Sequence, residues 1–173
     1  MKAPARLVGF ALIANPEVAS PEGEQPMPQT PAEFRDKFRV GENLLHRSDG
    51  WTVSLRPGAC TLGACVIGAD RPHVSLADID AGEAAALVDA VGWFEARVRA
   101  AFDADKFNYL ALMMVDDHLH FHALPRYAAP RSAGGVAWSD PGWPGQPDLK
   151  HANTADPQAL AAVRAALTGM PGA

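Results

Sequence analysis

The sequence predicts a single domain of the α+β class over residues 1–173, and three observations lead to this prediction. Two short runs rich in β-branched and apolar residues, 51 to 55 and 61 to 67, flank a Pro57-Gly58 turn and indicate an antiparallel strand pair. Apolar residues at helical spacing follow after Asp80. A further extended segment, residues 109 to 124, carries an apolar run and then strict alternation.

The composition bounds the kind of protein. Of the 173 residues 48% are hydrophobic and 20% charged, which matches the globular average and excludes a collagen-like, coiled-coil or wholly disordered chain. A net charge of −5 and a pI of about 5.6 argue against a large basic face for a nucleic acid polymer or an anionic membrane. The apolar runs are too short to span a bilayer. A small phosphorylated ligand, which needs only a few donors, stays open.

Cysteine usage and the N-terminus indicate a cytoplasmic protein. Cys60 and Cys65 are too few for a disulfide framework and lack ligand-spaced partners for a zinc site, so we expect buried thiols in a reducing cytoplasm. The apolar stretch from Leu7 to Ala14 contains Gly9 and lacks a small-residue cleavage site. We therefore expect a first strand there and not a signal peptide.

Proline and glycine, 15 of each, crowd two segments of the chain, residues 16 to 31 and 125 to 145. Both segments are expected to be long surface loops of one domain. The second loop carries Trp138 and Trp143, which we expect to act as packing anchors, with cover of a pocket or of a subunit interface as the alternative.

Two helices are predicted from capping boxes. Thr30 and Glu33 form one box with proline at the first helical position, which predicts a short helix over about 31 to 38. Asp80 begins a second helix over 81 to 102, whose apolar stripe predicts packing on the sheet. The stripe consists of Leu87, Val91, Phe94, Val98 and Phe102.

The remaining elements lie toward the C-terminus. The apolar run from Tyr109 to Val115 suits a central strand, or the first of two successive strands around a turn at Asp116-Asp117. Asp156 and Pro157 begin a C-terminal helix that ends before Gly169.

Three of the six histidines, His118, His120 and His122, occupy alternate positions. Side chains at alternate positions of a strand project to one face, so this strand presents a row of imidazoles. The residues between them pack on the other face, and these are Leu119, Phe121 and Ala123.

Three interpretations of the histidine row are open. The first is a solvated strand face or a set of core histidines bonded to backbone carbonyls. The second is a metal site, for which the outer two Cα atoms, about 13 Å apart at strand rise, lie far apart. Such a site needs a further ligand, with His73, Asp116, Asp117 and Cys60 as candidates. The third is nucleophilic catalysis, because a neutral imidazole can attack phosphorus and leave again, with the flanking rings orienting it.

The stretch from His118 to Leu124 fits the His-φ-His-φ-His-φ-φ signature, where φ is hydrophobic, and resembles the histidine-triad (HIT) superfamily of nucleotide hydrolases and transferases. Asn108-Tyr109-Leu110 upstream, Pro125-Arg126-Tyr127 downstream and Pro72-His73 extend the similarity. It covers roughly residues 51 to 127 and is weaker over the first 15 residues. Residues 16 to 50, an insertion or loop with a short helix, and the C-terminal extension 128 to 173 stay unexplained.

The resemblance implies a fold and a mechanism. The fold is an antiparallel sheet of about five strands with the 81 to 102 helix packed on it. His120 would attack the α-phosphorus of a (di)nucleoside polyphosphate or nucleoside phosphoramidate, forming a nucleotidyl-histidine that water hydrolyses. His118 and His122 match the flanking positions that bind the phosphate and assist the leaving group. Substrate-binding roles are implied for Asn108, His73 and Arg126, with no metal or cofactor, and related proteins are commonly homodimers.

The sequence also departs from the family. Many members carry a Gly-Gln pair and a hydroxyl residue before the triad that donate hydrogen bonds to the α-phosphate, whereas this chain has Met113, Met114 and Val115. Asp116 and Asp117 place negative charge beside the expected phosphate site, which weakens anion binding unless both turn away. The chain looks like a divergent, mainly bacterial branch resembling diadenosine tetraphosphate hydrolase-like HIT proteins. A non-catalytic nucleotide-binding protein and a His-ligated metalloprotein are the alternatives.

Overall fold

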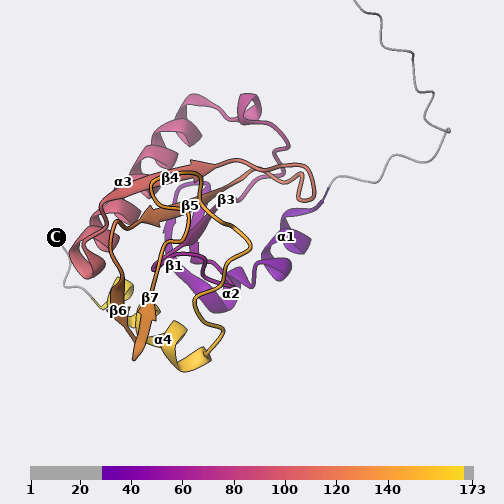
Figure 1. The fold of residues 1–173 in the computed structure, drawn as a ribbon. Coiled ribbons are helices and arrows are strands. Elements are labelled where there is room, and N and C mark those ends of the chain that lie inside the picture. The colour runs from indigo at the N-terminus through magenta and orange to yellow at the C-terminus, as the bar shows by residue number, and fades with distance from the viewer. Residues whose placement is uncertain (1–28, 170–173) are drawn as a thin grey trace, which may run out of the picture.

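The computed structural model describes residues 29–169, which form a five-stranded antiparallel sheet with helices on both of its faces (Figure 1). The strand order is β1-β2-β3-β5-β4, so the α+β prediction with five strands and a packed helix is confirmed. The strands are β1 (Leu44–Ser48), β2 (Trp51–Leu55), β3 (Cys65–Ala69), β4 (Lys106–Leu110) and β5 (His120–Arg126). The helices are α1 (Pro31–Lys37), α2 (Val40–Asn43), α3 (Ala81–Phe102) and α4 (Pro157–Thr168).

One face of the sheet carries the main core, which α3 covers. Asp80 caps this helix in a reciprocal capping box with Glu83, and Asp103 ends it in the left-handed conformation with φ 54°. Phe94 and Val98 of α3 are buried against alternate residues of β2, β3 and β5. The long helix predicted over 81 to 102 is confirmed. No helix among residues 29–169 is long and apolar enough to cross a membrane.

The opposite face carries a smaller cluster under α1 and α2. Helix α1 begins at the capping box of Thr30 and Glu33, as predicted, and Phe34 is its buried residue. Phe34 and Val40 pack on Val66 of β3. The two faces of the sheet therefore have different coverings, one long helix on one side and two short helices on the other.

Strand β1 is an element that the sequence analysis missed. It pairs with β2 through a tight connection at Asp49 and Gly50, and Gly50 has a φ of 83°. An Asp-Gly pair between two apolar segments is a strong hairpin signal because glycine adopts positive φ without steric cost. The segment 16 to 50 thus contributes an edge strand as well as a short helix.

The other strand boundaries differ from the predictions in two places. β3 begins at Cys65 and not at residue 61, because Gly63 turns the chain with a φ of 74°. The prediction of a central strand over 109 to 115 is wrong, since β4 ends at Leu110 and lies at the sheet edge. The alternative of two successive strands is close to the structure, because β4 pairs with β5 across a connection that contains both aspartates.

The C-terminal extension packs on the end of the sheet. A two-stranded ribbon, β6 (Arg131–Ala133) and β7 (Val136–Trp138), is anchored by Trp138, which is 1% exposed and donates its indole N–H to the Ala133 carbonyl. This confirms Trp138 as a packing anchor. Helix α4 follows with its predicted start at Pro157 and with Gly169 as its C-cap. The first strand expected over residues 7 to 14 lies outside the described residues.

Candidate active site

The three histidines line up on the face of the sheet that α1 covers. His120 and His122 lie on β5, and His118 comes just before this strand. In the register of β5 with β3, His120 lies opposite Gly68 and His122 opposite Val66. The intervening residues belong to the main core under α3: Leu119, Phe121 and Ala123. The predicted alternation of imidazoles and core residues is therefore present.

A hydrogen bond to the backbone determines which ring nitrogen of His120 carries the proton. Its Nδ1 atom lies 2.7 Å from the carbonyl oxygen of His118. A carbonyl only accepts, so Nδ1 carries the hydrogen and the Nε2 atom of the neutral ring carries a lone pair. Nε2 is buried and has no hydrogen-bond partner. This is the state of an imidazole that can act as a nucleophile.

His118 and His122 flank this nucleophile with free nitrogen atoms of their own. Nε2 of His118 lies 2.8 Å from the carbonyl oxygen of Ala69, which assigns the proton of His118 to that atom. Nδ1 of His118 and Nδ1 of His122 are buried and have no partner. The His120 and His122 rings meet edge to face, with 5.0 Å between centroids. A buried unpaired nitrogen is costly, so three in one row mark a site that gains from a polar ligand.

Burial keeps all three rings neutral. Desolvation is the main cause that lowers the pKa of His118 and of His120 from the usual 6.5. It lowers the pKa of His122 to about 4, and the positive charges of His120 and Arg56 add to the effect. Asp116 opposes the shifts at His120 and His122. At neutral pH the row therefore consists of uncharged imidazoles.

Two phenylalanines of the N-terminal region lie directly over the row, and we call Phe34 and Phe38 the phenylalanine cover. The Phe34 ring centroid lies 4.6 Å from that of His118 and 5.1 Å from that of His120. Phe38 lies 5.5 Å from His120 and 6.0 Å from His122 by the same measure. Because of this cover, the exposed fraction is 1% at His118, 0% at His120 and 8% at His122.

Polar contacts hold α1 in this position. Lys37 forms an ion pair with Asp116, and the backbone N–H of Gln29 donates to Asp117 Oδ1 over 2.8 Å. On the other side of the helix Arg35 pairs with Asp70 at 3.0 Å. These carboxylates face cations or donors, so the repulsion expected between Asp116, Asp117 and a bound phosphate is partly offset by Lys37.

The connection between β4 and β5 borders α1. A cavity of about 510 Å³ lies between them, lined by Gln29, Glu33, Lys37 and residues 114 to 117. Met114 and Val115 of this connection are 94% and 86% exposed. Their side chains offer no hydrogen-bond donor, as the sequence predicted. Glu33 and Lys37, which line this cavity, are the sequence neighbours of Phe34 and Phe38, whereas neither phenylalanine and none of the three histidines lines it.

The structure brings Asn108 and Arg126 together, at a distance along the sheet from the central imidazole. Asn108 lies opposite Leu124 in the pairing of β4 with β5, and its side-chain oxygen accepts from Arg126 Nη1. Arg126 is 3% exposed and makes an ion pair with Asp140 at 2.6 Å. Both side chains thus have intramolecular partners in this structure.

His73 lies beside the backbone of the segment that begins the histidine row. Its carbonyl accepts from the N–H of Leu119 at 2.7 Å, which places the His73 backbone beside the triad segment. Its ring is turned away and contacts Glu83 Oε1 at 2.9 Å. The position of His73 is close to the triad, whereas its imidazole is engaged with the first turn of α3.

Sequence reasoning missed the residues that cover and flank the row. The capping box predicted the short helix over about 31 to 38 but not what its side chains contact, and Lys37 and Arg56 were not singled out. The i, i+4 spacing of Phe34 and Phe38 was a signal for a shared contact, but only the fold shows that the contact is the histidine row. Within the described residues 29–169, no group of three or more His, Cys, Asp or Glu side chains is arranged to hold a metal ion.

Comparisons with known proteins agree with this geometry at the level of the fold. No protein-family model matches the sequence, and no curated protein matches it. Among solved structures, a histidine triad protein from Marinobacter aquaeolei VT8 is similar with a TM-score of 0.58 and 20% identity, over 76% of this chain and 90% of that one.

Two further solved structures support the same assignment. A hypothetical histidine triad nucleotide-binding protein from Sulfolobus tokodaii has a TM-score of 0.57 and 13% identity, over 73% of this chain and 81% of that one. A histidine triad (HIT) protein from Sinorhizobium meliloti 1021 has a TM-score of 0.56 and 17% identity, over 76% and 92%. This chain therefore has the fold of the histidine-triad proteins, with its own row of three histidines at the start of β5.

Proposed function

We propose that the protein is a nucleotide hydrolase or nucleotidyl transferase that cleaves at the α-phosphate of a (di)nucleoside polyphosphate or nucleoside phosphoramidate. The observation that carries the proposal is the unpartnered Nε2 atom of His120, whose lone pair is fixed by the bond from Nδ1 to the His118 carbonyl. The histidine-triad fold supports the class of substrate.

The reaction has two steps. In the first, the Nε2 lone pair of His120 forms a bond to the α-phosphorus, and the electron pair of the bond to the leaving group departs with that group, which takes up a proton. In the second, water attacks the same phosphorus, gives up a proton, and the N–P bond breaks to restore the neutral ring. An acceptor other than water in the second step makes the protein a transferase.

The flanking histidines assist both steps. Their unpartnered Nδ1 atoms lie beside the nucleophile, and a bound phosphate places negative charge next to them. Negative charge raises the pKa of an imidazole, so phosphate binding favours the protonated state that His122 lacks in the covered site. His122 then donates its proton to the leaving group, and His118, once phosphate binding has protonated its Nδ1 atom in the same way, donates to a phosphate oxygen.

The proposal requires α1 to move, because the three rings are at most 8% exposed beneath the phenylalanine cover. Displacement of α1 breaks the partly exposed pair of Arg35 with Asp70, which contributes little in water, and the pair of Lys37 with Asp116, whose mostly buried carboxylate loses its partner. It also exposes Phe34, which is the larger cost. Entry of the substrate base against Phe34 and Phe38 would offset part of that cost by stacking.

We extend the proposal to the residues and partners that the sequence indicated. Asn108, His73 and Arg126 would bind substrate, the protein would form a homodimer, and no metal or cofactor would take part. The free and buried thiols of Cys60 and Cys65 support a reducing, cytoplasmic location. For these roles, substrate binding would have to break the hydrogen bond between Arg126 and Asn108 and the ion pair between Arg126 and Asp140.

The test is a hydrolysis assay with diadenosine tetraphosphate and adenosine phosphoramidate. Wild-type protein is expected to release AMP from at least one of them, and His120→Ala to lose at least about 10³-fold in rate. His46→Ala is the matched control, because His46 lies on β1 and stacks on Trp93 away from the row. Protein quenched in alkaline denaturant, in which a histidine N–P bond survives, should carry an adenylyl adduct in the wild type alone. Equal inactivity of wild type and His120→Ala on both substrates contradicts the proposal.

A second function has its own support in the structure. The complete burial of His120 and the lack of donors at Met114 and Val115 favour a protein that binds a nucleotide without cleaving it. Such a protein would bind AMP with 1:1 stoichiometry and form no adduct after alkaline quenching. Trapping of an adenylyl-histidine excludes this alternative.

A further inference from the structure

A second cavity lies at the far end of β2, where α2, the turn after β2 and α4 meet. Its volume is about 440 Å³, which is within the range of small-molecule sites. Three of its lining residues are arginines from three separate elements, Arg39, Arg56 and Arg164, and we call it the arginine cavity. None of the triad histidines lines it.

The charge of the arginine cavity is positive although the chain as a whole is acidic. Glu42 is the one acidic residue that lines it, and this carboxylate is paired with Arg39 on the exposed surface. Three guanidinium groups against one carboxylate leave an excess of positive charge in a concave site. Field lines are focused in such clefts, which raises the local concentration of anions.

Arg56 supplies the buried donor of this cavity. Its Nη1 and Nη2 atoms donate to the carbonyls of Gly58 and Leu149, and these contacts hold the guanidinium in place. Its Nε atom is buried and has no partner. An unsatisfied charged donor costs free energy unless a ligand or water accepts from it, so a positioned guanidinium with a free N–H is suited to an anion.

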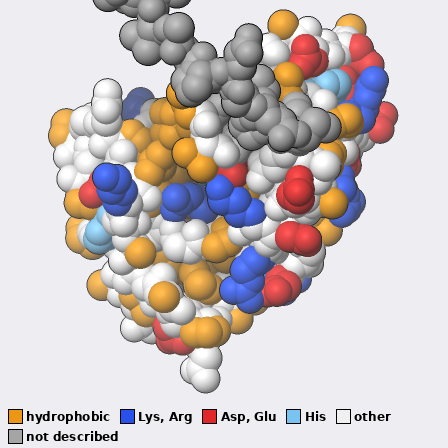
Figure 2. All heavy atoms as spheres, turned by 90° about the vertical axis from the view of Figure 1, so that its right-hand side faces the viewer, with side chains coloured by type: hydrophobic (Ala, Val, Ile, Leu, Met, Phe, Trp, Pro, Cys, Tyr) orange, Lys and Arg blue, Asp and Glu red, His pale blue; other side chains and the backbone are white. Residues whose placement is uncertain are grey.

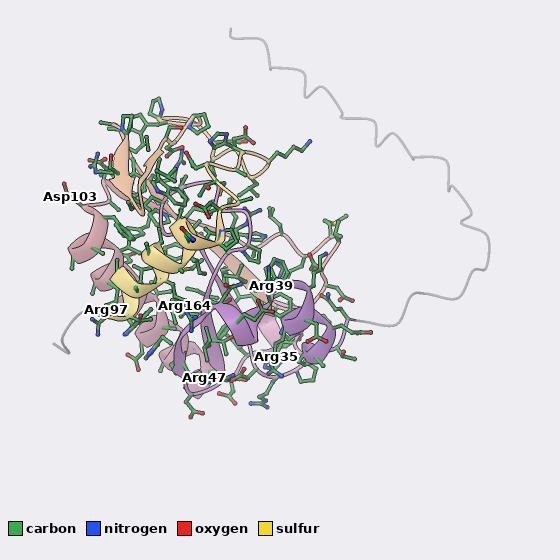
Figure 3. All side chains as sticks on the ribbon, turned by 90° about the horizontal axis from the view of Figure 1, so that it is seen from below. Arg35, Arg39, Arg47, Arg97, Asp103 and Arg164 are labelled. Carbon is green, nitrogen blue, oxygen red and sulfur yellow. The ribbon has the colours of Figure 1, made fainter. Side chains whose placement is uncertain are left out.

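The other two arginines come from α4 and from the start of α2. Figure 3 shows Arg164 on α4 and Arg39 beside α2. Arg39 is a non-glycine residue with a φ of 51°, in the left-handed region that such residues rarely adopt. The N-terminus of α4 also lies at the cavity, because Ala155 and Pro157 line it, but the Asp156 carboxylate caps this end, so the positive charge of the site comes from the arginines.

The walls between the arginines are apolar. Leu55, Pro57, Pro157 and Leu160 line the cavity together with the charged groups. Lys and Arg side chains, with hydrophobic ones between them, also gather near the middle of the face on which α1 lies (Figure 2). A ligand that matches the cavity therefore combines anionic groups with an apolar portion. Guanidinium groups bind phosphate oxygens in bidentate geometry, which lysines do not provide.

We propose that the arginine cavity binds a phosphorylated small molecule whose phosphate groups carry more than one negative charge. Arg56 and Arg164 donate hydrogen bonds to the phosphate oxygens, Arg39 borders the site from α2, and the apolar wall contacts the rest of the molecule. None of the three histidines lines the site, although Arg56 lies near enough to His122 for its charge to act there, and the proposal holds whether or not His120 is a nucleophile. Its ligand is either a free phosphorylated compound or the distal phosphates of a long substrate that reaches past His122.

The first test measures binding of inorganic tripolyphosphate by titration calorimetry. We expect one site per chain in the wild type and the same affinity in His120→Ala, because no triad histidine lines the cavity. Arg164→Gln and Arg39→Gln are each expected to weaken binding about tenfold, and the double variant about a hundredfold. Arg47→Gln is the control, because Arg47 lies at the other end of the β1-β2 hairpin and pairs with Asp70.

The outcomes separate the proposal from its alternatives. Absence of tripolyphosphate binding, or equal binding by wild type and the double variant, overturns it. Equal unfolding midpoints of the glutamine variants and the wild type show that lost binding is not lost folding. The second arm rests on the proposed function and measures KM. If Arg164→Gln raises the KM for diadenosine tetraphosphate but not for adenosine phosphoramidate, the cavity binds part of the substrate. If the KM is unchanged and tripolyphosphate binding is lost, the cavity binds a free ligand.

Discussion

The aromatic ring of Phe34 lies against the imidazole of His118, with 4.6 Å between the ring centroids and 42° between the ring planes. Phe34 also contacts His120 and fills the space above Gly68, so one side chain of α1 closes the middle of the histidine row. The position of α1 and the accessibility of the row are therefore coupled.

Phe38→Ala should open the row without unfolding the chain. Phe38 is half-buried, so its truncation is expected to cost about 2 kcal/mol, less than the ~3–5 kcal/mol of a fully buried phenylalanine. The variant removes the ring that contacts both His120 and His122. We expect the rate of histidine carbethoxylation at these two residues to rise several-fold, measured by mass spectrometry of digested protein.

The control for Phe38→Ala is Phe107→Ala. Phe107 is also half-buried, but it lies on β4 and packs against Phe94 of the main core. This variant should lose similar stability and leave the histidine modification rate unchanged. Equal acceleration in both variants would mean that general loosening, and not the phenylalanine cover, limits access.

Gly68→Ala should displace α1 from the sheet. A Cβ atom at Gly68 would lie 2.6 Å from Cε1 of Phe34, closer than van der Waals contact permits. The added methyl group is expected to cost about 1–3 kcal/mol by overpacking. Denaturant unfolding monitors the loss. Phe34→Leu in the same chain should recover part of it, because the smaller side chain leaves room for the methyl group.

The free energy of unfolding should fall between pH 6.5 and about pH 4. The pKa of His122 is lowered to about 4 in the folded state, whereas the unfolded ring titrates near 6.5. Above pH 6.5 both states are neutral, and below it the unfolded state alone binds the proton, so folding weakens as the pH falls. The contribution of His122 is on the order of 3 kcal/mol.

The pH effect can be assigned with His122→Asn. This variant removes the titrating group, and its unfolding free energy should change less between pH 7 and pH 4.5 than that of the wild type. Carboxylates with a lowered pKa, such as Glu33 and Glu83, contribute mainly below about pH 4.5, because their ordinary pKa is 4.5. Parallel pH curves for variant and wild type would show that His122 is not kept neutral by burial.

Arg126→Met should destabilise the chain strongly. Arg126 is 3% exposed, and its loss leaves the carboxylate of Asp140 buried without its partner. Breaking a buried pair from one side costs about 3–5 kcal/mol. The paired variant Arg126→Met with Asp140→Leu should recover much of the loss, as measured by thermal unfolding. A loss below about 1 kcal/mol in the single variant would contradict a structural role for the pair.

The sequence determined the local elements and the face on which the histidines lie. The capping boxes at Thr30 and Asp80 predicted the starts of α1 and α3, because capping is a contact within four residues. Alternation placed His118, His120 and His122 on one side of a strand for the same local reason. The Asp49-Gly50 pair carried the signal for β1 but lay in a segment interpreted as a loop.

The tertiary structure decided what lies on each face and which strands are neighbours. Strand β4 is an edge strand that ends at Leu110, inside the apolar run from Tyr109 to Val115, where its pairing with β5 ends opposite His122. The contacts of Phe34 with His118 and of Arg126 with Asp140 join residues 84 and 14 positions apart in the chain. Burial, and with it the protonation state of the row, arises only when these segments pack together, which no local pattern in the sequence encodes.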